Sequence, residues 1–374
     1  MTLSWTLRRF RPGDERGTIE LLRAVFGKWY SLEYWKWEYA ENPAGSPIIW
    51  LAESNGIVIG HYSVIPIRMK VGSVHTTGSF PLHAATHPDY RGQGILSSLM
   101  NKCCLDEGNN GLAFRYGFSN TNLGPTYKRY ERLGHICFMN RMIRVLDWRS
   151  LLAGYLRHRF LTKATALSPQ RMRRIEPTRG DFTIEVLSRF DERFDELWQH
   201  ISRNFRIIAE RDREYLNWRY TSHPEQEYTI CTVEESHRIL GYSVLSEERW
   251  HNLRFGRIVD LLGFQDRRNV LDHLVHWAVE FFKEKGAHAV TCTMSEEHPY
   301  TPVLRKAGFI THPRHMNRAL YAAINLRGLA TDEREIYTQA LRLSQSHFLR
   351  KRSNWSMMQG DLCEDFHEGF SIID

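Results

Sequence analysis

Hydrophobic residues in the first half of the chain alternate between two spacings. Short segments have an apolar residue at every second position, which is typical of strands with one buried face. Longer segments have one at every third or fourth position, which is typical of amphipathic helices. The predicted strands are 5–10, 48–53, 57–69, 79–86, 112–118 and 136–145, and the predicted helices are 14–26, 92–105 and 122–133, the first with Asp14 as its N-cap. Strands interleaved with helices in this way predict a mixed α/β sheet.

The second half of the chain repeats this order of elements. Strands are predicted at 182–187, 228–233, 239–245, 257–264 and 289–294, and helices at 192–204, 269–285 and 300–307. A short motif aligns the two halves, because Tyr-x-x-Trp-x-Tyr occurs at 34–39 and again at 215–220. The offset is 181 residues, and Gly60 and Gly241 share it. The sequence therefore predicts two copies of one fold in tandem.

The tandem arrangement divides the chain into four predicted regions. They are an N-terminal domain at 1–146, a basic linker at 147–180, a C-terminal domain at 181–320 and a tail at 321–374 without a third copy. A chain of 374 residues is too long for one ordinary core, which agrees with two domains.

Composition and charge exclude some classes of protein and select none. Hydrophobic residues make up 42% and charged residues 25%, which is typical of globular proteins and excludes a disordered or collagen-like chain. A net charge of +7 permits an anionic partner, and a phosphorylated cofactor satisfies it as well as a nucleic acid does. No apolar run approaches the ~18–20 residues that span a bilayer, and the N-terminus has no secretory signal pattern.

The cysteines and histidines bear on compartment and metal chemistry. The six cysteines include no Cys-x-x-Cys pair and no metal-type spacing, which is typical of buried thiols in a reducing compartment, so we expect a cytoplasmic protein. The eighteen histidines form no recognisable ligand set, so we expect no metal.

The strongest chemical signal is a glycine-containing loop between a strand and a helix. A turn at 87–90 joins the strand 79–86 to the loop Arg91-Gly92-Gln93-Gly94, and an amphipathic helix follows. The glycines let the backbone approach a ligand, and N–H groups converge where the helix dipole favours an anion. Arg91 adds a positive charge, so the segment predicts a pyrophosphate site. Neither Gly-x-Gly-x-x-Gly nor Gly-Lys-Ser/Thr is present, which excludes a Rossmann or Walker motif.

This loop resembles the signature of the GNAT N-acetyltransferases, (Gln/Arg)-x-x-Gly-x-(Gly/Ala), which holds the coenzyme A pyrophosphate. Leu96 departs from the Gly or Ala of the signature, but Gly-Ile-Leu is similar to the enhanced-intracellular-survival acetyltransferases, which also carry tandem GNAT modules. The resemblance implies two tandem GNAT acyl-CoA N-acyltransferase folds, with acetyl-CoA or another acyl-CoA as cofactor. It implies these cofactor-binding residues: Leu82, Ala84, Thr86, Arg91, Gly92, Gln93, Gly94, Ile95, Leu96, Asn120 and Asn122. For the two asparagines, capping of the following helix is an equal alternative.

The resemblance also implies a proton donor. The segment 130–135 is similar to the family's Tyr-x-x-x-Gly-Phe, with His135 in place of Phe, and the family's tyrosine protonates the departing thiolate. Tyr130 inherits that role, and a phenol is protonated at neutral pH as the role requires. Tyr127, one turn earlier, competes with it, and a packing role for Tyr130 is the alternative.

The general base is left open by the sequence. His83 lies on the strand before the loop, and the ordinary pKa of histidine suits proton abstraction from an amine. A histidine that fills the face of the sheet is an equal interpretation. Glu33 and Glu38 are further candidates, and both are consistent with a solvated helix face.

The second copy lacks both chemical elements. Its loop after Phe264 has no glycine and contains Asp266, and Leu304 stands where the first copy has Tyr130. We therefore expect a non-catalytic GNAT fold that shapes the acceptor site or stabilises the first copy. The repeated Tyr/Trp motif is then structural, with Trp37 in the core, although aromatic residues near 29–39 could border an acceptor cleft.

The resulting hypothesis is an N-acyltransferase that moves an acyl group to the primary amine of a small molecule by direct attack in a ternary complex. An amino sugar leads among acceptors because of the aromatic-rich N-terminal helix. One alternative is a non-catalytic tandem-GNAT scaffold that binds coenzyme A or a metabolite. The weakest hypothesis is nucleic-acid or membrane-surface binding through the basic segment 157–179. The acyl-chain length and the oligomeric state, including a homo-oligomer, stay open.

Overall fold

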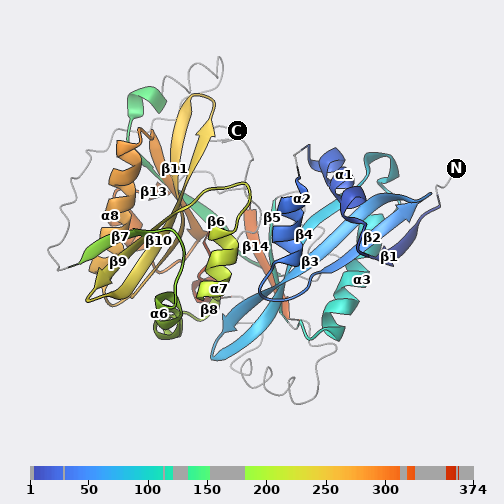
Figure 1. Cartoon of the computed structure of the whole chain (residues 1–374), viewed down its shortest axis with the longest axis horizontal. Coiled ribbons are helices and arrows are strands. Elements are labelled where there is room, and N and C mark those ends of the chain that lie inside the picture. Colours follow the sequence, from blue (N-terminus) through green and yellow to red (C-terminus); the bar gives the residue numbers. More distant parts are fainter. Residues whose placement is uncertain are drawn as a thin grey trace. The chain divides into compact units, whose positions relative to one another are not determined.

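The structure is a computed structural model that describes residues 4–27, 30–112, 114–120, 134–151, 182–311, 318–324, 351–358 and 361. The chain forms two compact units (Figure 1). Unit 1 comprises Met1–Phe138, Phe205–Glu225 and Asn317–Asn354, and unit 2 comprises Met139–Asn204, Gln226–Met316 and Trp355–Asp374. The prediction gave each domain one continuous stretch, 1–146 and 181–320. Each unit instead combines separate stretches of sequence.

Unit 1 is built on a sheet in the order β1-β2-β3-β4-β5-β14-β6, antiparallel except for the parallel pair β4–β5. Its strands are β1 (Thr6–Arg9), β2 (Ile48–Ser54), β3 (Ile57–Val71), β4 (Val74–Thr86), β5 (Phe114–Asn120), β14 (Arg318–Ile324) and the first residues of β6 (Gly134–Val145). The short β8 (Ile207–Ala209) pairs with β3. The strand β14, which was not predicted, comes from beyond the second repeat and pairs along all of β5.

Helices cover both faces of this sheet (Figure 1). They are α1 (Glu15–Phe26), α2 (Leu32–Trp35) with the π-helical turn η1 (Lys36–Ala40), the 3₁₀ turn η2 (Pro88–Tyr90), α3 (Ile95–Asn109), α7 (Arg213–Leu216) with the π-helical turn η5 (Asn217–Thr221), and the 3₁₀ turn η6 (Arg352–Asn354). Val58 packs toward α1, whereas Gly60 packs beneath α3. Asp14 is the N-cap residue of α1, as predicted, but its carboxylate accepts from Arg8 and from the Arg11 N–H and not from an N–H of the helix.

Unit 2 contains a second sheet in the order β7-β9-β10-β11-β12-β6, with β13 also paired to β6. Its strands are β7 (Thr183–Leu187), β9 (Thr229–Glu235), β10 (Arg238–Trp250), β11 (Leu253–Gly263), β12 (Ala289–Ser295), β13 (Ile310–Thr311) and residues 139–145 of β6. Its helices are α6 (Arg193–Ile201) with η4 (Ser202–Asn204), α8 (Arg268–Glu284) and α9 (Thr301–Lys306). Phe194 of α6 packs on Tyr242, and Phe282 of α8 packs on Gly256, so the two helices supply separate parts of the core.

The mixed α/β fold with two GNAT-like sheets is confirmed. Every predicted strand and helix within the described residues is present, with its ends moved by a few residues. The predicted helix 122–133 lies outside the described residues, as do most of the linker 147–180 and of the tail 321–374. Within the described part of the chain, no helix combines the length and apolar character needed to cross a membrane.

The internal repeat is visible in local geometry. Asn55 and Gly56 form a two-residue hairpin turn with positive φ at both positions, and Ser236 and His237 do the same between β9 and β10. Such turns match the right-handed twist of paired strands. The sequence offset of 181 residues therefore corresponds to equivalent places in two equivalent folds.

Candidate active site

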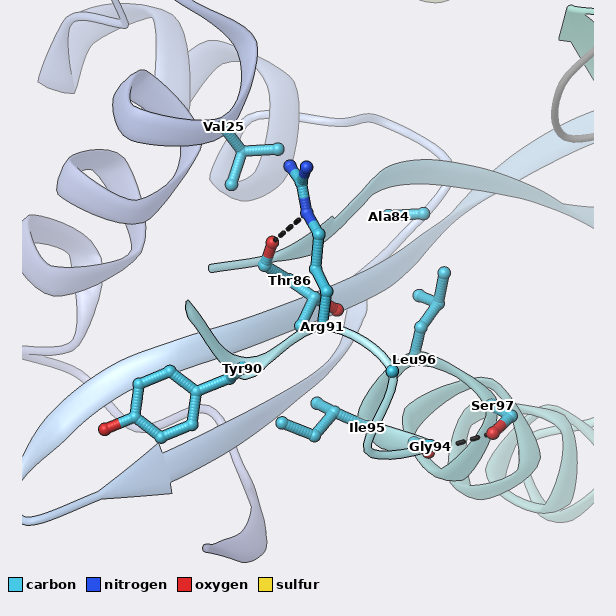
Figure 2. A pocket seen from close by; sticks show the side chains of 10 residues that line it. Val25, Ala84, Thr86, Tyr90, Arg91, Gly94, Ile95, Leu96 and Ser97 are labelled. Carbon is cyan, nitrogen blue, oxygen red and sulfur yellow. Dashed lines mark hydrogen bonds between the residues drawn. The ribbon is translucent and has the colours of Figure 1, made fainter. Parts of the chain in front are cut away.

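The glycine loop lies where α3 begins. Gly92 and Gly94 have φ values of 79° and 77°, which residues with a β-carbon rarely adopt. A Cβ on Gly92 would meet no atom within 4 Å, so backbone conformation and not space requires glycine there. Gly94 is the N-cap residue, and its carbonyl accepts from the hydroxyl group of Ser97 (Figure 2). It also accepts from the hydroxyl group of Ser98. The first turn of α3 has no acidic residue, so its N–H groups and the helix dipole favour an anion.

A cavity of about 340 Å³ opens beside this loop. Its walls come from α1, the end of β4, the loop and the start of α3, and are made by Val25, Ala84, Thr86, Tyr90, Arg91, Gly92, Gly94, Ile95, Leu96 and Ser97. Arg91 donates from Nε to the Thr86 carbonyl over 3.3 Å, and its guanidinium extends toward Val25 (Figure 2). A fixed positive charge therefore stands at the cavity, next to the helix N-terminus.

The cavity includes seven of the predicted cofactor residues. They are Ala84, Thr86, Arg91, Gly92, Gly94, Ile95 and Leu96. Leu82 is 2% exposed in the core, and Gln93 does not line the cavity. Asn120 ends β5 opposite Arg318 of β14, whereas Asn122 lies outside the described residues, as do Tyr127 and Tyr130. The assignments of these residues stay predictions.

Strands β4 and β5 separate near the cavity. They pair only at Gly78 and Ser79, and β5 then pairs along its whole length with β14. Among the described residues, no strand pairs with this edge of β4 after Ser79. An extended ligand can hydrogen-bond to such an edge as an added strand does.

A β-bulge interrupts the other edge of β4. His83 and Ala84 lie between the pairs His61–Ala85 and Ser63–Leu82, where β3 has only Tyr62. His83 has φ 47°, in the left-handed region that is uncommon for residues other than glycine. The bulge lies at the cavity, because Ala84 is one of its walls.

His83 itself lies away from the cavity. Its side chain is 4% exposed, and Nε2 lies 2.8 Å from Oε2 of Glu38, whose side chain is 2% exposed. The rings of Phe26, Tyr30 and Tyr39 surround it, with centroids 5.3–6.2 Å from that of His83. The sequence named both His83 and Glu38 as base candidates but gave no sign of this contact. The alternative of a solvated helix face does not hold for Glu38, which is buried.

The aromatic motif is structural, as expected for Trp37. Tyr34, Trp35, Trp37 and Tyr39 are all less than 9% exposed. Trp37 stacks on Trp218, its counterpart in the second repeat, at a centroid distance of 5.4 Å. Of the aromatic residues expected to border an acceptor cleft, Tyr30 is half-buried and Trp29 lies outside the described residues.

The second repeat differs at each of these places. Six residues separate Gly263 from Val270, whereas eight separate Thr86 from Ile95, and the N-cap of α8 is Arg267. The Tyr300 hydroxyl accepts from the Gly263 N–H and donates to its carbonyl, and so occupies the end of β11. Ser295, at the end of β12, is hydrogen-bonded to the carbonyls of Trp355 and Met357. The sequence showed the loop without glycine and its Asp266, but not the contacts of Tyr300 and Ser295.

Three buried cysteines and the metal-ligand residue types bear on the thiol and metal expectations from the sequence. Burial raises the pKa of the Cys231 thiol to about 12 and also raises the pKa values of Cys103 and Cys292, which suits core residues and not nucleophiles. The described residues contain no group of three or more His, Cys, Asp or Glu side chains that could hold a metal ion.

Comparison with known proteins identifies the fold. Residues 6–134 match the family described as acetyltransferase (GNAT) domain. A GCN5-related N-acetyltransferase from Anabaena variabilis is similar in structure, with a TM-score of 0.61 and 13% identity over 86% of this chain and 73% of that one. An N-myristoyltransferase from Saccharomyces cerevisiae with bound myristoyl-CoA and inhibitors has a TM-score of 0.58 and 11% identity over 87% of this chain and 80% of that one. A sequence search of curated proteins found no match.

Proposed function

Since residues 6–134 match the acetyltransferase (GNAT) domain family, we propose that this chain transfers an acyl group from acyl-coenzyme A to an amine. The observation that carries the proposal is the loop Arg91–Gly94. Two glycines with positive φ, a helix N-terminus without acidic residues and a guanidinium meet there at one cavity. That combination suits a pyrophosphate.

The residues around the cavity have separate proposed tasks. Loop N–H groups and Arg91 bind the pyrophosphate, and the edge of β4 after Ser79, which pairs with no strand of the described residues, binds the extended arm that follows it. Acyl-coenzyme A supplies the thioester when bound. Tyr130 keeps its proposed role as the donor of a proton to the leaving thiol.

The acceptor is proposed to be the primary amine of a small molecule. The aromatic residues that put an amino sugar first are mostly buried, so stacking on a sugar no longer favours it over other amines. The acetyl group is the proposed acyl group because it is the default of the family. A cytoplasmic location stays a prediction from the cysteines.

Calorimetric titration with acetyl-CoA tests the proposal. Wild-type protein should show saturable binding at one site, and Arg91→Glu combined with Gly94→Trp should weaken it roughly 100-fold or more. The matched control is Arg16→Glu with Gly13→Trp. It reverses an exposed charge and fills another positive-φ glycine with open space around it, so its binding should be unchanged.

The outcomes separate the hypotheses. Binding followed by release of free thiol in a screen of amines would support the enzyme. Binding without turnover for any amine would favour the non-catalytic scaffold. If wild-type protein binds neither short nor long acyl thioesters, the proposed function is wrong.

A further inference from the structure

The bulge in β4 interrupts its regular register with β3. A bulge places two residues opposite one, so part of the strand loses regular pairing. Here the two residues are His83 and Ala84, and the φ of 47° at His83 adds conformational strain. Such a conformation persists only where surrounding contacts hold it.

Two side chains of β3 contact backbone carbonyls of the bulge region. The Nδ1 of His61 lies 2.8 Å from the His83 carbonyl, and the Ser63 hydroxyl donates to the Leu82 carbonyl over 3.1 Å. Because a carbonyl only accepts, His61 carries its proton on Nδ1. Both side chains belong to fully buried residues, so these bonds have no competition from water.

The π-helical turn η1 holds the same bulge through two consecutive residues. Glu38 accepts from Nε2 of His83 at 2.8 Å, and the Tyr39 hydroxyl lies 2.9 Å from the Ser63 hydroxyl. Since Ser63 donates to Leu82, Tyr39 donates to Ser63. The turn η1 therefore contacts the side chain of His83 directly and the Leu82 carbonyl through the Ser63 hydroxyl.

The second repeat provides an internal comparison. At the offset of 181 residues, Glu38, Tyr39, His61 and Ser63 correspond to Arg219, Tyr220, Tyr242 and Val244. In β11 the register shift lies at Val259. It is further along the strand from Gly263, the partner of Gly241, than the bulge of β4 is from Thr86, the partner of Gly60. No residue of β11 has a positive φ. The tyrosine is thus kept in both repeats, whereas the strained conformation and the other three supporting side chains occur only in the first.

We propose that Glu38, Tyr39, His61 and Ser63 form a clamp that fixes the bulge of β4 and so positions the cavity wall at Ala84 for the acyl group. His83 is then a positioning residue that links the clamp to the backbone, and not the general base. The proposal rests on the proposed function, because the acyl group reaches Ala84 only if acyl-coenzyme A binds at the loop. The clamp itself is a property of the protein without ligand.

The first measurement needs no substrate. Hydrogen–deuterium exchange of residues 80–87 should rise about tenfold in Glu38→Ala and less in Glu38→Gln, which keeps an acceptor for Nε2–H. Glu41→Ala, an exposed carboxylate three residues later, should match wild type. Unchanged exchange in Glu38→Ala would overturn the clamp, whatever the protein binds.

The second measurement separates positioning from general destabilisation. In Glu38→Ala the kcat should fall on the order of 10- to 100-fold, while the affinity for coenzyme A, which has no acyl carbonyl, should stay near that of wild type. A parallel loss of coenzyme A affinity and of folded protein would mean that the role is merely structural and would overturn the proposal.

The third measurement distinguishes a positioning residue from a base. His83→Asn retains a residue that tolerates positive φ but loses the contact with Glu38. The clamp predicts faster exchange at 80–87 and an unchanged pH profile of the remaining activity. Wild-type exchange together with loss of the acidic limb of the pH profile, where a general base becomes protonated, would make His83 the base and would overturn the proposal. If wild-type protein binds no acyl-coenzyme A, the exchange results still decide whether the clamp exists.

Discussion

In both repeats a glycine on the second hairpin strand lets a helix pack closely, with Gly60 beneath α3 and Gly241 beneath α8. A Cβ on Gly60 would lie 2.7 Å from the Ile95 side chain, and one on Gly241 would lie 3.0 Å from the Val270 side chain. The two glycines also face equivalent partners, Ala52 and Val233. Both repeats thus keep what the fold needs for packing.

The repeats differ where a ligand would bind. The parallel pair β4–β5 stops at Ser79, whereas β11–β12 continues through Arg257 and Ile258. Beyond that point the second repeat is filled by its own atoms, the Tyr300 hydroxyl and the backbone of 355–357. The second repeat therefore keeps the packing of a helix on a hairpin but lacks the groups that we propose bind an anion in the first.

The largest expected effect on cofactor binding comes from giving the first repeat the loop of the second. Replacement of residues 87–94 by residues 264–269 removes both positive-φ glycines and Arg91 and shortens the loop. We expect acetyl-CoA binding to fall below detection by calorimetry, a loss of roughly 100-fold or more, while the core beneath α3 still folds. Circular dichroism checks the fold, and retained binding would contradict the role of the loop.

Tyr300→Phe provides the control in the second repeat. The substitution frees the Gly263 N–H and carbonyl but restores no glycine loop. The number of acetyl-CoA molecules bound per chain should stay at one, since an open strand edge without an anion site does not hold a pyrophosphate. A second molecule bound would show that Tyr300 alone closes that site.

The next largest effect is a loss of stability at acidic pH that comes from the first repeat alone. His61 titrates there, whereas its counterpart in the second repeat is Tyr242. Complete burial lowers the pKa of His61 to about 3, against 6.5 in a model compound. Between these values the unfolded chain binds a proton and the folded chain does not, so stability is lost as the pH falls from about 6.5 toward 3. At about pH 4.5 the loss from this group is on the order of 3 kcal/mol.

His61→Asn isolates this effect. Asparagine can still donate to the His83 carbonyl but does not titrate. Denaturant unfolding of both proteins at about pH 7 and about pH 4.5 should show a smaller loss of stability in the variant. Equal losses in the two proteins would mean that His61 is not the group responsible.

The sequence predicted what depends on neighbours along the chain. The strands follow from alternating apolar positions, and the loop at 91–94 follows from its glycines and arginine, because these signals are local. The constant offset between the motifs that contain Trp37 and Trp218 also revealed the internal repeat, because both copies keep the residues needed for the same packing.

Contacts between distant residues could not be predicted in this way. The pairing of β14 with β5 joins residues about 200 positions apart, and no local pattern distinguishes this strand from one that would stay with its own repeat. Likewise, Glu38 stands in a polar sequence context that is typical of a solvated helix face. Its contact with His83 follows only from the folded structure. The same holds for Tyr300, whose partner Gly263 carries no signal of its own.

The pair Trp37 and Trp218 joins the repeats' equivalent turns, η1 and η5, inside unit 1. The indole of Trp37 donates to the Trp218 carbonyl over 2.6 Å, and the indole of Trp218 donates to the Trp37 carbonyl over 2.8 Å. The contact is reciprocal, so each tryptophan makes the same bond. It is not fully symmetric, because the Arg219 guanidinium lies 5.6 Å from the ring centre of Trp37.

The contact of Arg219 with Trp37 predicts the smallest effect, a difference in the free energy of unfolding between two matched variants. Trp37→Phe and Trp218→Phe each remove one buried N–H donor, and each should lower the free energy of unfolding by about 1–3 kcal/mol. Trp37→Phe should cost more by about 0.5–1 kcal/mol, because phenylalanine holds a cation less well than tryptophan does. Denaturant unfolding of both variants in an Arg219→Met background should remove that difference while leaving the shared cost. A difference that persists without Arg219 would mean that the two turns are less alike than their reciprocal bonds indicate.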